Sequence, residues 1–134
     1  MTDIELLRPA GLVNNPAFSH VAVIPAGATT IQVGGQNAVD AAGSLVGGDD
    51  VASQTRQVVA NVESALAAAG AAFADVISWT ILLVDGTDLG AAYAGAARAF
   101  DPDRDPPLVS VAKVAGLAVP GALVEATVVA AVMP

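Results

Sequence analysis

Residues 76–84 read Val-Ile-Ser-Trp-Thr-Ile-Leu-Leu-Val. β-Branched and large apolar residues dominate this stretch, which predicts a β-strand. Successive residues of a strand point to opposite faces of its sheet. One face would carry Ile77, Trp79, Ile81 and Leu83, and the other Val76, Thr80, Leu82 and Val84. Because both faces are largely apolar, the pattern predicts an inner strand covered on both sides.

An amphipathic helix is predicted on each side of this strand. In residues 51–69 the apolar positions recur at spacings of three and four, with Asp49 or Asp50 as the N-terminal cap and Gly70 as the C-terminal cap. The second helix would begin in the turn 85–88 and end at 101–102. Its apolar face would consist of Leu89, Ala92, Tyr93, Ala96 and Phe100.

Four further strands complete the expected fold. Residues 20–25 and 29–34 flank Gly27 and are expected to pair as a hairpin, and residues 108–114 and 122–132 follow the second helix. The order of strands, helix, strand, helix and strands predicts a single α+β domain over residues 1–134, with both helices on one face of a sheet. The other face would then need a different cover.

Composition narrows the classes of function. The net charge is −8 with only five basic residues, which disfavours binding to nucleic acids or anionic membranes. The chain has no cysteine, no basic and apolar signal segment at its start and no apolar run long enough for a membrane span, so we expect a cytoplasmic protein. Hydrophobic residues make up 54% and charged residues 13%, which favours an oligomer with part of its surface buried.

Four motifs occur in the order and spacing of a known family. They lie at Asn15–His20, Val33–Gln36, Gln54–Val62 and Leu123–Ala126. Together they resemble the RidA (YjgF-like) family, which includes imine and enamine deaminases, and the resemblance covers nearly the whole chain. It implies a chorismate-mutase-like sheet with two helices on one face. Three copies would pack as a homotrimeric barrel with a small-molecule cleft at each interface.

The departures from the family pattern gather at its substrate site. Active members carry Pro-x-Arg-Ser/Thr, whose arginine holds the substrate carboxylate, whereas this chain has Val109 before Ser110. Phe18 stands at the family's tyrosine, Gly34 at a pocket serine and Tyr93 at an asparagine of the second helix. The chain thus resembles the branch of the family that lacks the arginine.

Glu125 matches the glutamate that positions water in the family, so the resemblance implies that it is the catalytic residue. The implied small-molecule site also contains Phe18, Gly34, Gly35, Tyr93, Val109, Ser110 and Val111, with no cofactor and no metal. Two functions stay open without the arginine. One is hydrolysis of an imine or enamine other than the usual amino-acid-derived ones, and the other is ligand binding without catalysis by a trimeric sensor or carrier. Endoribonuclease activity, a label the family has carried, is disfavoured by the acidic charge.

Lys113 is a candidate to replace the missing cation. It shares a strand face with Val109, but four residues separate their backbones by about 13 Å. Lys113 would therefore serve only through its long side chain or from a neighbouring subunit, and an arginine of a neighbouring subunit is the other candidate.

Other polar residues are expected to have no catalytic role. His20 is the only histidine and lacks the partners of a triad or a zinc site. Asp101, Asp103 and Asp105 have the spacing of calcium ligands, but Pro106 replaces the glycine of such loops. We expect Trp79 to lie in the core or an interface.

Overall fold

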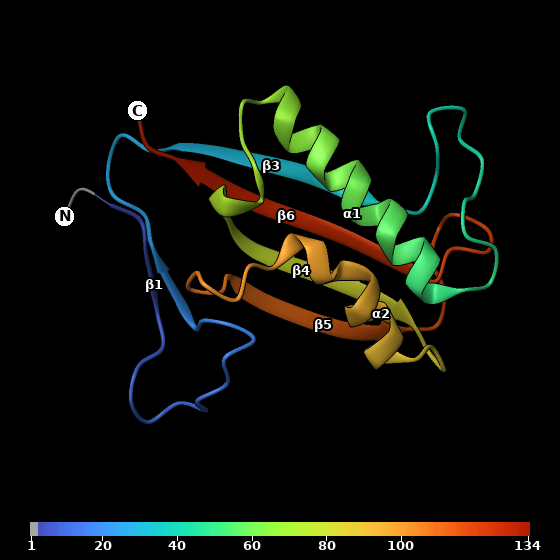
Figure 1. Ribbon diagram of the computed structural model, residues 1–134, viewed down its shortest axis with the longest axis horizontal. Coiled ribbons are helices and arrows are strands. Elements are labelled where there is room, and N and C mark those ends of the chain that lie inside the picture. Colours follow the sequence, from blue (N-terminus) through green and yellow to red (C-terminus); the bar gives the residue numbers. More distant parts are fainter. Residues whose placement is uncertain (1–2) are drawn as a thin grey trace.

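The computed structural model describes residues 3–134, which form a four-stranded sheet, a separate two-stranded ribbon and two α-helices (Figure 1). The strand order in the large sheet is β3-β6-β4-β5. Its strands are β3 (Thr29–Gln36), β6 (Val124–Val132), β4 (Val76–Val84) and β5 (Leu108–Val114). β6 runs antiparallel to both β3 and β4, whereas β5 runs parallel to β4. The predicted α+β architecture, with both helices on one face, is confirmed.

The two faces of the sheet differ in cover. Both helices lie in front of it in Figure 1, and on that side Trp79 and Leu83 of β4 are buried. On the opposite side, called the open face below, Thr80 is exposed and Leu82 is half-buried. The helices therefore cover one side of β4, and cover of its other side by something other than the helices stays a prediction.

The first helix, α1 (Val51–Ala68), is closed at both ends by the predicted caps. The carboxylate of Asp50 accepts the amide of Ser53 at 3.1 Å. At the other end Gly70 adopts φ +77°, and the amide of Ala71 reaches back to the carbonyl of Leu66 at 2.9 Å. The apolar face of α1 packs on the sheet, with Val58, Val59, Val62 and Leu66 buried.

The second helix, α2 (Leu89–Ala96), begins at Asp88, whose carboxylate accepts the amides of the first turn. It ends earlier than predicted and continues as the 3₁₀ turn η2 (Ala97–Ala99). Its buried side consists of small residues, Ala92, Gly95 and Ala96. Small residues let α2 approach α1 closely. Leu89 and Tyr93 are 41% and 39% exposed, yet together with Ala92, Ala96 and Phe100 they line a small pocket beside the buried Leu83 and Val124, so the predicted apolar face is turned toward the sheet.

The predicted hairpin of residues 20–25 and 29–34 is wrong. β2 (Val21–Val23) pairs with β1 (Glu5–Leu7) in the separate ribbon, and β3 pairs with β6. The physical reason is long-range pairing: β6 offers β3 a long register from Thr29 to Gln36, which a three-residue β2 does not match.

Trp79 lies in the core, as predicted. Its ring is 3% exposed and lies 6.2 Å from the ring of Phe73 and 5.4 Å from that of Phe100. Phe73 belongs to the 3₁₀ turn η1 (Phe73–Asp75), and Phe100 follows η2. This aromatic cluster joins the ends of both helical segments to the sheet. None of the helices in residues 3–134 is long and apolar enough to cross a membrane.

Candidate functional site

Glu125 lies on the open face of the sheet, in β6, with Leu82 of β4 as its cross-strand partner. The residue is half-buried, and no group within residues 3–134 donates a hydrogen bond to its carboxylate. On the β3 side, a Cβ atom placed on Gly35 would lie 3.0 Å from the Cδ and Oε2 atoms of Glu125. The glycine therefore leaves room for the carboxylate, which is available for a water molecule or a ligand.

Side-chain amides hold the glycine segment beside Glu125. The register of β3 and β6 shifts between Val33 and Gln36, which is where Gly34 and Gly35 lie. Just beyond, Asn37 donates from Nδ2 to the carbonyl of Val124 at 3.3 Å. This bond ties the end of β3 to the residue that precedes Glu125.

Asn61 of α1 holds the residues that follow Gly34 and Gly35 in the chain. Its Nδ2 atom donates to the carbonyl oxygens of Asn37 at 3.0 Å and Val39 at 2.9 Å, and its Oδ1 atom accepts from Gln57 at 2.9 Å. Asn37 and Asn61 were not among the predicted site residues. Asn61 belongs to the motif Gln54–Val62 and Asn37 directly follows the motif Val33–Gln36, so the sequence signal for both was their place in or beside these motifs.

β5 distributes its predicted site residues over both faces. Val109 and Val111 pair with Trp79 and Ile81 of β4, so they face the helices. Ser110 pairs with Thr80 and faces the open side, as Glu125 does. Among the predicted binding residues, Ser110 and Gly35 share the open side of the sheet with Glu125, because Ser110 pairs with Thr80 and a Cβ atom on Gly35 would meet the Glu125 carboxylate.

Phe18 and Tyr93 lie away from Glu125. The ring of Phe18 contacts that of His20 edge-on at 5.4 Å, and His20 Nε2 is 2.8 Å from the carbonyl oxygen of Val13. The amide of Ser19 donates to the carbonyl of Pro107 at 3.0 Å, which fixes this loop beside the start of β5. Tyr93 is 39% exposed on α2. His20 thus has a structural contact within its own loop.

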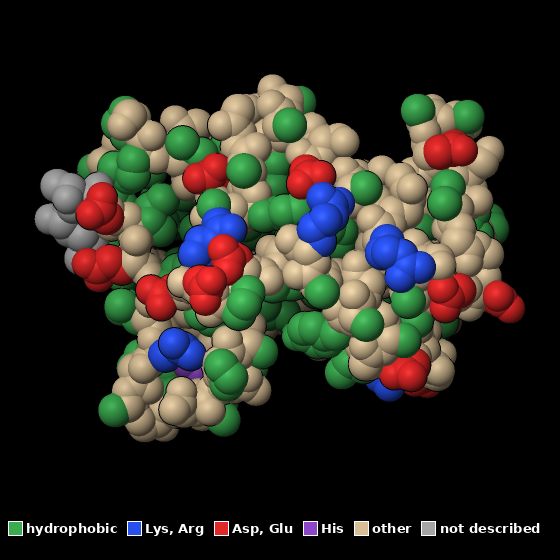
Figure 2. Space-filling model, viewed as in Figure 1, with side chains coloured by type: hydrophobic (Ala, Val, Ile, Leu, Met, Phe, Trp, Pro, Cys, Tyr) green, Lys and Arg blue, Asp and Glu red, His purple; other side chains and the backbone are tan. Residues whose placement is uncertain are grey.

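The basic side chains are dispersed over the surface. Figure 2 shows them singly and interspersed with carboxylates on the helical side. Arg98 pairs with Glu63 at 2.7 Å, and Arg104 pairs with Asp101 at 3.2 Å. Lys113 is exposed and has Leu83 as its partner in the adjacent strand. No lysine or arginine of residues 3–134 forms an ion pair with Glu125.

Comparison with known proteins identifies the family. The family model described as endoribonuclease L-PSP matches residues 12–132, nearly the whole chain. The chain belongs to this family. No curated protein matches it.

Solved structures of the same family agree with this assignment. A Rid-family protein of unknown function from Yersinia pestis is 31% identical, with a TM-score of 0.83, 98% of this chain covered and 100% of that one. A YjgF-family member from Mycobacterium tuberculosis is 29% identical, with a TM-score of 0.64 and coverage of 97% and 100%. A putative endoribonuclease from Thermotoga maritima, 23% identical with a TM-score of 0.71 and coverage of 96% and 93%, shares the fold. The resemblance of the sequence to the RidA family is thus confirmed.

Proposed function

We propose that this RidA-family protein hydrolyses an imine or enamine and that Glu125 positions and activates the attacking water. The observation that carries the proposal is the half-buried carboxylate of Glu125, which has no hydrogen-bond donor within residues 3–134 and lies directly against Gly35, where a larger residue would crowd it. A carboxylate within reach of a bound water is a suitable general base.

The reaction needs one carboxylate and no cofactor. Water adds to the carbon of the C=N bond, while Glu125 takes a proton from the water and the imine nitrogen gains one. The carbinolamine that forms then loses ammonia as the C–N bond breaks, which leaves a carbonyl compound. An enamine enters the same sequence after protonation at carbon converts it into the imine. Gly35 and the amides that brace it would keep the carboxylate in place throughout.

The substrate class follows from the missing cation. The position that holds arginine in active relatives is Val109, and its partner in β4 is the buried Trp79, so it faces the helical side. Around Glu125 the open face carries hydroxyl and apolar side chains, among them Thr80, Leu82 and Ser110. A substrate carboxylate would lack its ionic partner there, which is costly away from water. We therefore expect an imine without a carboxylate.

The proposed site requires further copies of the chain. The open face carries the half-buried apolar side chains of Leu82, Val84 and Val129, which no helix covers. Covering this face with two neighbouring copies, as the resemblance implies, would make a homotrimer and close a cleft over Glu125. Size-exclusion chromatography with light scattering tests the assembly, and a monomeric mass at micromolar concentration would contradict it.

The decisive experiment measures ammonia release above the spontaneous rate. The purified protein is given 2-aminoacrylate, generated in situ, and in parallel an aliphatic aldimine without a carboxylate, generated from an amine by an amine oxidase. We expect activity on the second substrate and loss of about 100-fold in Glu125→Gln. The control is Glu63→Gln, which alters a glutamate paired with Arg98 on the helical side. Equal rates in Glu125→Gln and the wild type would refute the role of Glu125.

Ligand binding without catalysis is the second candidate function. Within residues 3–134 no cation forms an ion pair with Glu125, which favours ligand binding over deamination of a substrate that carries a carboxylate. It predicts saturable binding of an imine analogue with no ammonia release. Endoribonuclease activity is the least supported, because the chain carries a net charge of −8 and two of its arginines are paired with carboxylates. A gel shift with RNA at low salt is expected to show no complex.

A further inference from the structure

A cavity lies on the helical side of the molecule, away from Glu125. It has a volume of about 420 Å³ and lies between the loop that follows β1, the turns η1 and η2, and residues 101–107. Its walls are mostly apolar, with three aromatic rings and four prolines, namely Phe73, Tyr93, Phe100, Pro16, Pro102, Pro106 and Pro107. Both the volume and the apolar lining are typical of small-molecule sites.

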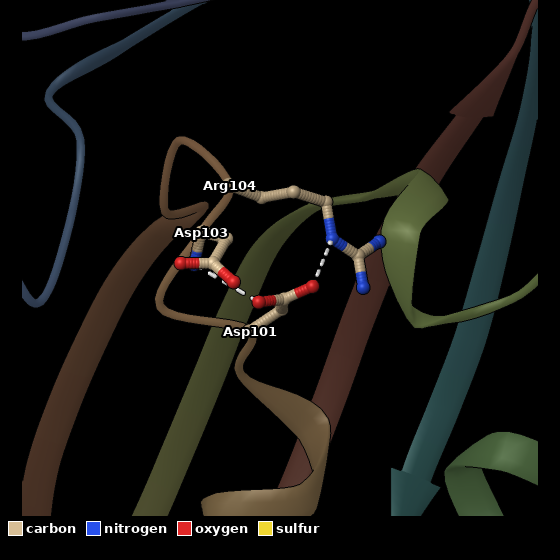
Figure 3. A network of polar contacts seen from close by, with 3 residues as sticks. All are labelled: Asp101, Asp103 and Arg104. Atoms are coloured by element: carbon tan, nitrogen blue, oxygen red, sulfur yellow. Dashed lines mark hydrogen bonds and ion pairs between the residues drawn. The ribbon is translucent and has the colours of Figure 1, made fainter.

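The charged residues of this cavity come from one loop. Asp101, Arg104 and Asp105 all line it. Figure 3 shows the Asp101 carboxylate between the backbone amide of Asp103 and the guanidinium of Arg104, with distances of 2.9 Å and 3.2 Å. The amide of Asp103, together with Arg104, holds the pKa of Asp101 below its usual value, so the pair is ionised at neutral pH. Arg104 is thus neutralised by its own neighbour.

Asp105 is the remaining charged residue in the lining of the cavity. No group of residues 3–134 pairs with its carboxylate, so the lining has one negative charge in excess. The net charge of −8 on the whole chain adds to the negative electrostatic potential at the cavity. An anionic ligand would be repelled both locally and at long range, whereas a cation would be attracted.

We infer that this cavity binds a small apolar amine in its protonated form. The apolar body would occupy the space between the aromatic rings and prolines, and the ammonium group would pair with Asp105. Aromatic rings add to such a site because their faces attract cations, and Phe73 already does so for the guanidinium of Arg98, 5.7 Å from its ring centre. The inference does not depend on the proposed function, since Glu125 does not line this cavity.

The test compares matched probes by isothermal titration calorimetry on the intact protein at low salt. Phenethylammonium is the cation, 3-phenylpropionate the anion and 2-phenylethanol the neutral control. We expect phenethylammonium to bind about tenfold more tightly than the neutral probe, with 3-phenylpropionate weakest. Binding of the cation should weaken as salt is added.

Two variants locate the binding site, and a third controls for total charge. Asp105→Asn should weaken phenethylammonium binding about fivefold, whereas Asp103→Asn removes the same charge from a neighbour outside the lining and should leave affinity unchanged. Ala97→Trp, at an exposed lining position on η2, should fill the cavity and abolish binding. Heat unfolding confirms that each variant is folded.

Four outcomes would overturn the inference. The first is equal affinity for the cation and the anion, and the second is an equal loss of affinity in Asp105→Asn and Asp103→Asn, which would indicate general attraction by the net charge. The third is undiminished binding in a folded Ala97→Trp variant, which would place the amine elsewhere. The fourth is that none of the three probes binds, whatever the oligomeric state of the wild type.

Discussion

The side chain of Gln54 links α1 to the loop before this helix, at Gly48, and to residues 121–123, which precede β6. The residue is fully buried, and its side chain makes three hydrogen bonds. Nε2 donates to the carbonyl oxygens of Gly48 at 2.7 Å and Gly121 at 3.0 Å, and Oε1 accepts the amide of Leu123 at 2.9 Å. We predict that Gln54→Met destabilises the protein, because methionine keeps the length and helix propensity of glutamine but none of these bonds.

The magnitude follows from the three bonds. Each contributes about 1 kcal/mol net, so their loss costs about 3 kcal/mol. The two glycine carbonyls belong to exposed residues and regain water, and the methionine side chain gains apolar burial. These effects return about 1 kcal/mol, which leaves a net loss of about 2 kcal/mol. For a domain of this size the midpoint of thermal unfolding should fall by about 8 °C.

Urea unfolding, followed by the fluorescence of the buried Trp79, measures this difference at one fixed protein concentration. The control is Gln57→Met on the same helix, which removes one side-chain bond to Asn61. We expect it to cost less than about 1 kcal/mol. If Gln54→Met is as stable as Gln57→Met, the three bonds do not hold these segments together and the reasoning fails.

Three more substitutions probe single contacts. Gly95→Ala places a Cβ atom 2.5 Å from a backbone carbonyl oxygen of α1, so we expect urea unfolding to show a loss of about 1–3 kcal/mol from forcing the helices apart. Gly35→Ala meets only the flexible end of Glu125; its stability should stay within about 1 kcal/mol of the wild type while ammonia release falls about tenfold, and an unchanged rate would argue against the site. Asp50→Ala removes the cap of α1. The side-chain hydroxyl of Ser53, followed by its amide, lowers the pKa of Asp50, so the cap stabilises the fold above pH about 4 and this contribution is lost as the pH falls further. The difference in urea midpoint between Asp50→Ala and the wild type should therefore be larger at pH 7 than at pH 3.

The first helix and the strand β4 were predictable from the sequence because their signals are local. The spacing of apolar residues and the caps at Asp50 and Gly70 define α1, and the alternation in residues 76–84 defines β4. The pairing of strands depends on residues far apart in the sequence, so local patterns did not predict it. β3 takes its partner from a segment about a hundred residues further along the chain, and β1 is only three residues long, too short for a recognisable period.

The candidate site was predictable only in part. The resemblance pointed to Glu125 and Gly35, which the structure brings together. The predicted site residues of β5 do not come together in this way. Because successive residues of a strand point to opposite faces, Val109 and Ser110 of one chain cannot both line the same cavity. The aromatic cavity on the helical side had no sequence signal, because its lining comes from turns and loops far apart in the chain.

The central place of β6 in the sheet also governs the order in which the protein can fold during synthesis. β6 is synthesised after the other strands of this sheet, yet it lies between β3 and β4, which are made much earlier. Until it emerges, both of these strands lack their shared partner, and within the large sheet only the parallel pair of β4 with β5 can form. The nascent chain therefore keeps apolar strand edges exposed through most of translation, a state in which chaperones are most needed.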